Sequence, residues 1–122
     1  MQIFLVLGAI NGFLAVALGA FGAHGLEGKL TENMLKTWEK AVNYQMFHTM
    51  ALLVVGLMLF KVNVTGLKVA GWLFLIGIIL FSGSLYFYST TGISSLAMIT
   101  PFGGMTFLIG WITFGYIALK YL

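Results

Sequence analysis

The sequence has 122 residues, which leaves room for a single domain. Charged residues make up 7% of it and hydrophobic residues 61%, whereas a soluble domain carries about a quarter charged residues, so a soluble globular protein is excluded. The net charge of +3 comes from lysines that form no basic stripe with aromatic residues, which excludes a nucleic-acid partner. No cysteine is present, which excludes disulfides and thiol catalysis.

Charged residues divide the chain into segments that are long enough to cross a membrane. Segments 1–26, 41–60 and 69–119 are free of charge, and about 20 apolar residues cross the hydrocarbon core. A cluster of small polar residues at 89–95 divides the third segment in two. We therefore predict one all-α transmembrane domain over 1–122, a four-helix bundle with helices at about 2–24, 42–60, 68–89 and 98–119.

The ends of these helices carry local signals. The first segment lacks the basic start of a secretory signal, so we expect it to be retained as a helix. Gly25 follows His24 and suits the left-handed residue that ends a helix. Thr100 and Pro101 suit an N-cap and first helical residue; the alternative is a helix that begins near Ser95 and is kinked at Pro101.

Segment 31–41 has a different pattern. Thr31 suits an N-cap and Glu32 a first helical turn. Apolar residues then recur at helical spacing, at Met34, Leu35, Trp38, Ala41 and Val42. The pattern predicts a short amphipathic helix between helices one and two, with Trp38 at headgroup depth. A simple N-terminal extension of helix two explains it equally well.

The lysines give only a weak signal for orientation, with three on each side: Lys61, Lys68 and Lys120 share the side of the termini, and Lys29, Lys36 and Lys40 the other. The α-amine and the lysine-free loop at 89–97 favour cytoplasmic termini in a cell membrane. Most of the tryptophans and tyrosines, such as Trp72 and Trp111, lie near span ends or on lipid-facing surface, as is typical of aromatic belts.

Small residues recur on one face of several spans. They include Gly8, Gly12, Gly19 and Gly22 in the first helix, Gly77 in the third, and Gly103 and Gly110 in the fourth. Small residues let helix backbones approach closely in a membrane, so we interpret these stripes as packing seams. A pathway lined by backbone is the alternative. The pattern leaves open whether the partner helix belongs to this chain or to a second copy, so a homo-oligomer stays possible.

Polar residues inside the spans are few. Those that gather around the ends of helices one to three are His24, Tyr44, Gln45, His48, Thr49, Ser82 and Ser84, and Asn11 lies deeper in the first helix. Antiparallel packing would bring His24 and His48 to one side of the membrane, as a proton relay or ligand pocket. The alternative is that hydrogen-bonded histidines lock helices one and two together.

Other kinds of site have weaker support in the sequence. No charged residue lies well inside a span, which argues against an ion-coupled pump. Two histidines fall short of a metal's three or four ligands unless Glu27 or Glu39 joins them, so we predict no metal or other cofactor. No catalytic motif is present, and we predict no enzyme.

Four motifs together resemble a known family. They are Gly19-Ala20-Phe21-Gly22-Ala23-His24-Gly25-Leu26, Tyr44-Gln45-Met46-Phe47-His48-Thr49, Phe81-Ser82-Gly83-Ser84-Leu85-Tyr86, and Ile99-Thr100-Pro101-Phe102-Gly103-Gly104 continuing to Gly110-Trp111. In this order they resemble the bacterial "domain of unknown function 423" membrane family, which is related to eukaryotic transmembrane protein 256. The resemblance implies a small four-helix protein of the cytoplasmic membrane with its termini inside. It implies no activity.

Three functions are compatible with these features. The first is a non-enzymatic protein that acts through helix packing, as an oligomer or as a partner of other membrane proteins. The second is a small transporter or channel subunit that uses the polar cluster, and it requires a water-filled path. The third is a lipid-binding protein that uses the first loop and its lysines. The bilayer itself is the partner that all three share.

Overall fold

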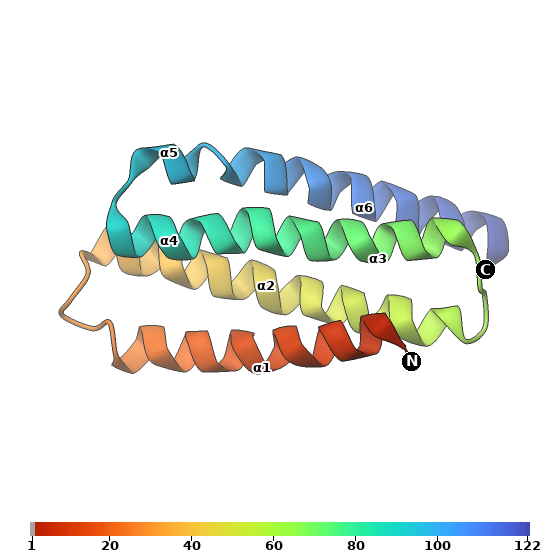
Figure 1. Cartoon of the computed structure of the whole chain (residues 1–122), viewed down its shortest axis with the longest axis horizontal. Coiled ribbons are helices and arrows are strands. Elements are labelled where there is room, and N and C mark those ends of the chain that lie inside the picture. Colours follow the sequence, from red (N-terminus) through yellow and green to blue (C-terminus); the bar gives the residue numbers. More distant parts are fainter. Residues whose placement is uncertain (1) are drawn as a thin grey trace.

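The computed structural model describes residues 2–122, which fold into four long helical spans (Figure 1). The elements are α1 (Ile3–His24), α2 (Glu32–Leu59), α3 (Thr65–Gly77), the π-helix η1 (Ile78–Gly83), α4 (Ser84–Thr91), α5 (Ser94–Ala97) and α6 (Thr100–Tyr121). The third span runs without a break through α3, η1 and α4. All four spans are long and apolar enough to cross a membrane, and residues 2–122 contain no strand. The predicted all-α four-helix architecture is confirmed.

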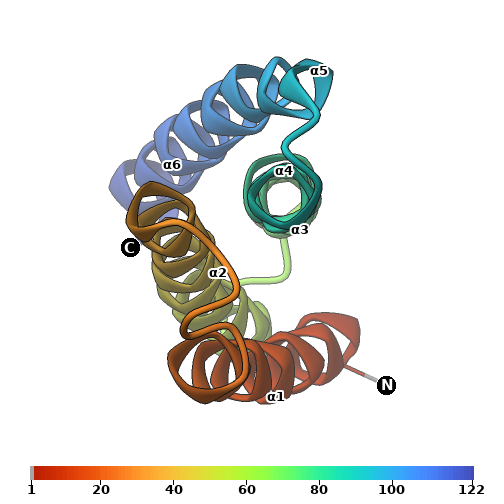
Figure 2. The same ribbon diagram turned by 90° about the vertical axis from the view of Figure 1, so that its left-hand side faces the viewer.

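Each of the four spans packs mainly against the spans that precede and follow it in the sequence. α1 packs on α2, α2 packs on the third span, and the third span packs on α6. Viewed from one end, α1 and α6 therefore lie far apart, with α2 and the third span between them (Figure 2). Phe4, Leu52, Val55 and Phe74 form the centre of the main hydrophobic core. Both termini lie at the end where α2 connects to α3 (Figure 1).

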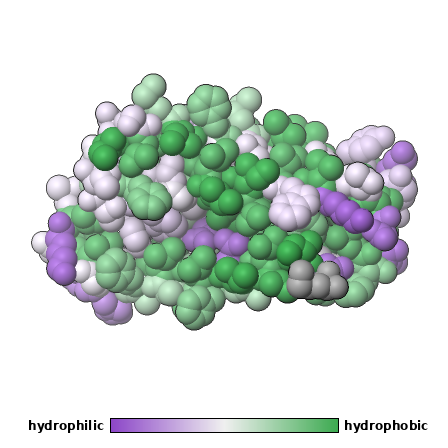
Figure 3. All heavy atoms as spheres, in the orientation of Figure 1, coloured by the Kyte–Doolittle hydropathy of each residue, from purple (hydrophilic) through white to green (hydrophobic). Residues whose placement is uncertain are grey.

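The surface has the distribution of a membrane-spanning protein. On the face shown in Figure 3, most hydrophilic residues gather at the two ends of the bundle and hydrophobic residues cover most of the length between them. Large apolar side chains are exposed along the spans, including Phe13 of α1, Phe87 of α4 and Ile112 of α6. Such a surface is stable in lipid and would aggregate in water.

Segment 31–41 forms the first turns of α2, so the second of its two interpretations is the one that the chain adopts. Thr31 caps this helix, because its Oγ1 accepts a hydrogen bond from the Met34 N–H at 3.2 Å. Trp38 is 5% exposed, and its indole N–H donates to the Leu18 carbonyl of α1 at 2.9 Å. It therefore joins α1 to α2 instead of anchoring in the lipid headgroups.

Two helix ends differ from expectation. Gly25 has φ −83°, and the left-handed residue of this loop is Gly28, with φ 78°. The Gly25 prediction is wrong because α1 closes with right-handed turns, in which the Gly25 and Leu26 N–H groups both donate to the Phe21 carbonyl. Thr100 is not the N-cap of α6: the N-cap is Ile99, so Thr100 and Pro101 are the first two residues of the helix, after a break that separates α6 from α5.

The glycine stripes face helices of the same chain. A Cβ atom added to Gly8 or Gly12 would meet Leu53 or Thr49 of α2, and one added to Gly22 would overlap Trp38. A second set of glycines lies between the third span and α6. Gly77 faces Phe107, Gly110 faces Phe74, and Gly103 faces the backbone of Phe81. The close approaches that these glycines permit are therefore used inside the bundle.

Candidate functional site

The side chain of His48 is held from both sides in the middle of the bundle. It is 3% exposed, and its Nδ1 lies 2.8 Å from the Tyr44 carbonyl oxygen, which can only accept a hydrogen bond. The indole N–H of Trp111 on α6 donates to His48 Nε2 at 3.0 Å. These two bonds together require the neutral ring with its proton on Nδ1.

Aromatic rings complete the surroundings of His48. Its ring stacks on Phe107 of α6 with centroids 3.5 Å apart and planes 8° apart, and Phe47 meets it edge-on at 5.2 Å. His48 thus tethers α2 to α6, two helices that otherwise meet mainly through the third span.

His24 lies far from His48. Gly12 faces Thr49 and Gly22 faces Trp38, so α1 and α2 run antiparallel with His24 level with the first turns of α2. About eleven residues of α2 separate that level from His48, which corresponds to about 16 Å along the helix axis. His24 is exposed at the end of α1, and the structure does not bring the two histidines together.

A hydrogen-bonded chain of side chains joins three spans near the bundle centre. The Gln45 amide on α2 donates to Asn11 Oδ1 of α1 at 3.0 Å and accepts from the Tyr86 hydroxyl of α4 at 2.7 Å. Asn11 in turn donates to the Leu7 carbonyl at 2.9 Å. We refer to Asn11, Gln45 and Tyr86 as the polar chain. It acts as a clamp on α1, α2 and the third span.

Three hydroxyl residues of the predicted cluster also make packing contacts. Ser82 in η1 is fully buried and donates to the Ala41 carbonyl of α2 at 2.7 Å, so the wide π-turn sets the third span against α2. Ser84 bonds Thr100 at 2.6 Å. Thr49 donates to the Gln45 carbonyl in its own helix. Every buried side-chain nitrogen and oxygen in residues 2–122 has a partner.

A large groove opens between α2 and α6. Its volume is about 830 Å³, and its lining comes from α2, η1 and α6: Asn43, Tyr44, Phe47, His48, Phe81, Pro101, Gly104, Met105, Phe107, Leu108 and Trp111. Phe47, Met105 and Leu108 are about 60% exposed on its walls, and the Tyr44 ring lies on Phe81 at 4.4 Å along its floor. The groove is mostly aromatic, with its polar groups concentrated on α2.

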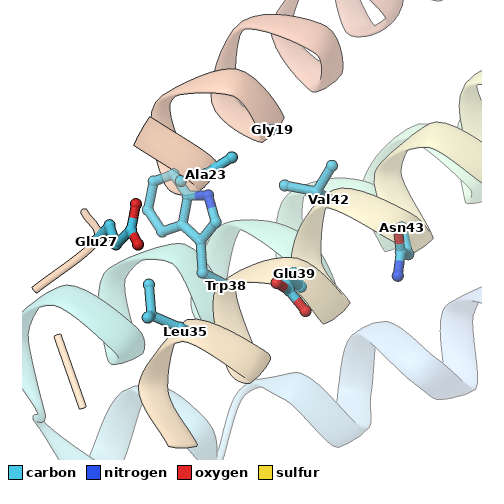
Figure 4. A pocket seen from close by; sticks show the side chains of 9 residues that line it. Gly19, Ala23, Glu27, Leu35, Trp38, Glu39, Val42 and Asn43 are labelled. Atoms are coloured by element: carbon cyan, nitrogen blue, oxygen red, sulfur yellow. The ribbon is translucent and has the colours of Figure 1, made fainter. Parts of the chain in front are cut away.

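A second cavity of about 470 Å³ lies at the end of the bundle where α1 connects to α2 (Figure 4). It is lined by Gly19, Gly22, Ala23, Glu27, Leu35, Trp38, Glu39, Val42 and Asn43. Asn43 also lines the α2–α6 groove, so this residue borders both hollows. Within residues 2–122, no group of three or more His, Cys, Asp or Glu side chains is placed to hold a metal ion.

Comparison with known proteins agrees with this architecture. Residues 18–104 match the family described as "Protein of unknown function (DUF423)". The chain belongs to the DUF423 family. The match runs from the end of α1 through α2 and the third span to the first turn of α6, so it includes His48 and stops short of Trp111.

Relatives of this DUF423 protein are similar over nearly their whole length. The UPF0382 membrane protein YwdK of Bacillus subtilis is 52% identical over 123 residues, covering 100% of both chains. A UPF0382 membrane protein of Staphylococcus epidermidis is 48% identical over 121 residues, covering 99% of this chain and 98% of its own. No solved structure matches the chain. With four candidate spans of its own, this DUF423 chain is a membrane protein.

The bond between Trp111 and His48 predicts a modest loss of stability in the Trp111→Phe variant. Polar pairs between membrane helices contribute about 0.6 kcal/mol on average, and phenylalanine keeps much of the ring packing. We expect the free energy of unfolding in detergent to fall by about 1 kcal/mol, and the ¹⁵N spectrum of His48 to show the neutral Nδ1–H form in the parent. Trp72→Phe is the control, because Trp72 packs edge-on against Phe4 at the lipid surface. An Nε2–H tautomer in the parent would contradict the arrangement.

Proposed function

We propose that this DUF423 protein is a non-catalytic membrane protein that binds the apolar chain of an amphiphile in the α2–α6 groove. One observation carries the proposal: tightly packed spans leave an aromatic groove of about 830 Å³ between them. Binding sites for small molecules are of this size and are mostly apolar, with a few polar groups that set orientation. Rigid aromatic rings lose little conformational freedom when a flexible chain settles against them.

Two features favour this function over packing with other proteins and over transport. The glycine seams that would support an oligomer already face helices of the same chain. The polar residues that would form a transport path are hydrogen-bonded to one another and to the backbone, as in the polar chain and at His48. The α2–α6 groove, in contrast, is not filled by contacts between the helices.

The proposal extends to location and orientation. We place the protein in the bacterial cytoplasmic membrane with both termini in the cytoplasm, on the lysine pattern and the lysine-free loop at 89–97. The cavity beside the α1–α2 loop then faces the outer surface, at the end of the bundle opposite the termini (Figure 1).

Filling part of the groove should weaken binding. Gly104 lines it, and an added Cβ would meet its nearest neighbour, the Phe81 ring, only at 4.0 Å, so the backbone leaves room for a side chain that extends into the groove in Gly104→Leu. Native mass spectrometry of protein released from membranes should show one retained amphiphile per parent chain. Because the leucine side chain takes up part of the groove, we expect the affinity for the amphiphile to fall about tenfold in Gly104→Leu, which corresponds to about 1.4 kcal/mol, and the retained fraction to fall with it.

Gly115→Leu is the matched control. It introduces the same side chain in the same helix, at a position with open space around it and outside the groove. Equal occupancy in parent, Gly104→Leu and Gly115→Leu would refute groove binding. A parent that carries no amphiphile, or that appears as a dimer whose interface Gly104→Leu breaks, would refute it too and assign the groove to a second copy.

A further inference from the structure

We infer that the amphiphile carries a protonated amine in its headgroup, held by Glu39 and Asn43 at the mouth of the groove. This inference rests on the proposed function and names the class of ligand. It starts from the two hollows that Asn43 borders: the α2–α6 groove, which would take the apolar chain, and the cavity beside the α1–α2 loop, which would take the headgroup.

The two hollows share one face of α2. Glu39, Asn43 and Phe47 follow one another at four-residue spacing, so they form a stripe along this helix. Glu39 lines the loop-side cavity, Phe47 lines the groove, and Asn43 lines both. Figure 4 shows the Glu39 and Asn43 side chains on the same side of α2, while Trp38 points toward α1. Polarity therefore falls step by step from the cavity into the groove.

The depth of this stripe matches the boundary between headgroups and hydrocarbon. Gly22 near the end of α1 packs on Trp38, so Glu39 lies level with the last turn of α1. On α6 the groove runs from Pro101 to Trp111, ten residues and about 15 Å toward the bundle centre. An amphiphile whose headgroup lies at Glu39 would thus place its chain along the groove, parallel to the surrounding lipids.

Charge selects the class of headgroup. The loop and the first turns of α2 contain three lysines and three glutamates, yet the charged residues that line the loop-side cavity are Glu27 and Glu39. Carboxylates only accept hydrogen bonds, and a protonated amine only donates them. An anionic headgroup without an amine would face like charge here. The cavity therefore complements an ammonium group, with the Asn43 amide as an additional acceptor.

The test compares two phospholipids that differ only in the headgroup. The full chain is placed in nanodiscs with equal amounts of phosphatidylethanolamine and phosphatidylglycerol that bear identical acyl chains, and native mass spectrometry identifies the retained lipid. Ion pairs near a protein surface contribute about 0.2–1 kcal/mol, so we expect a roughly 1.4- to fivefold excess of the amine lipid in the parent. Glu39→Gln should bring this ratio close to one, by lowering the amount of phosphatidylethanolamine that is retained.

Glu32→Gln is the matched control, because Glu32 belongs to the same helix and does not line the cavity. A ratio that Glu39→Gln and Glu32→Gln change equally, or an excess of phosphatidylglycerol in the parent, would overturn the inference. Retention of both lipids in equal amounts, sensitive to Gly104→Leu, would overturn the headgroup assignment and leave groove binding intact. A parent that retains neither lipid would overturn both proposals.

Discussion

Gly103→Ala is expected to destabilise the protein more than any other single-methyl change on the α6 seam. A Cβ at this position would overlap the backbone nitrogen of Phe81 and come within 2.8 Å of the Leu80 carbonyl carbon. Backbone in the middle of a span cannot move aside as a side chain can, so α6 must shift away from η1. Overpacking costs typically about 1–3 kcal/mol, and we expect the upper part of that range. Thermal unfolding in detergent micelles measures it.

Gly115→Ala in the same helix provides the reference. No atom lies within 4 Å of its added Cβ, so this variant keeps the gain in helix propensity of about 1 kcal/mol without any clash. The two variants should therefore move the melting temperature in opposite directions. If Gly103→Ala is as stable as Gly115→Ala, α6 does not dock on η1 as closely as the structure has it.

The glycine seams show which features of the fold can be predicted from the sequence alone. The charge-free segments and the glycine spacing predict four spans with close-packed faces, because membrane thickness and backbone approach are local constraints. The identity of the facing helix depends on topology, since Gly77 meets Phe107 thirty residues away. The bond from Trp111 to His48 connects residues 63 positions apart, and in the sequence Trp111 indicated only an aromatic belt.

The prediction that His24 and His48 lie close together is wrong for a specific reason. The charge-free segment that begins at 41 is only the apolar part of α2, whereas the helix itself begins at Glu32 and includes Lys36, Glu39 and Lys40. Placing its start near residue 42 put His48 two turns from the helix end, when it lies more than four turns in. Hydropathy indicates which part of a helix is surrounded by lipid. It does not give the first residue of the helix, which here is set by the cap at Thr31.

The π-helix η1 left no comparable signal in the sequence. Its residues Ile78 to Gly83 read as ordinary apolar helix, and the widened turn becomes evident only when Ser82 is seen against the Ala41 carbonyl. The two wide hollows that Asn43 borders are likewise set by the angles between helices. Those angles follow from the packing of whole faces and not from any short motif.

Gln45→Leu is expected to cause the second large loss of stability. The substitution takes a hydrogen-bond partner from Asn11 and from Tyr86 at once, and Asn11 is 6% exposed. A buried polar group left without a partner costs about 1–3 kcal/mol, and neither helix can turn its orphaned group toward water inside a bilayer. We expect the free energy of unfolding in detergent to fall by about 1–3 kcal/mol.

A triple variant distinguishes the cost of orphaned groups from the value of the bonds themselves. Asn11→Leu, Gln45→Leu and Tyr86→Phe together remove every partner of the polar chain while keeping the ring that packs edge-on against Trp38 at 4.7 Å. Replacing all partners with apolar groups of similar shape is close to neutral, so this variant should recover most of the stability lost in Gln45→Leu. Thr106→Val is the control for losing a hydroxyl that bonds only within its own helix. A triple variant less stable than Gln45→Leu would mean that the polar chain contributes net binding energy between the helices, as a specific clamp that apolar packing cannot replace.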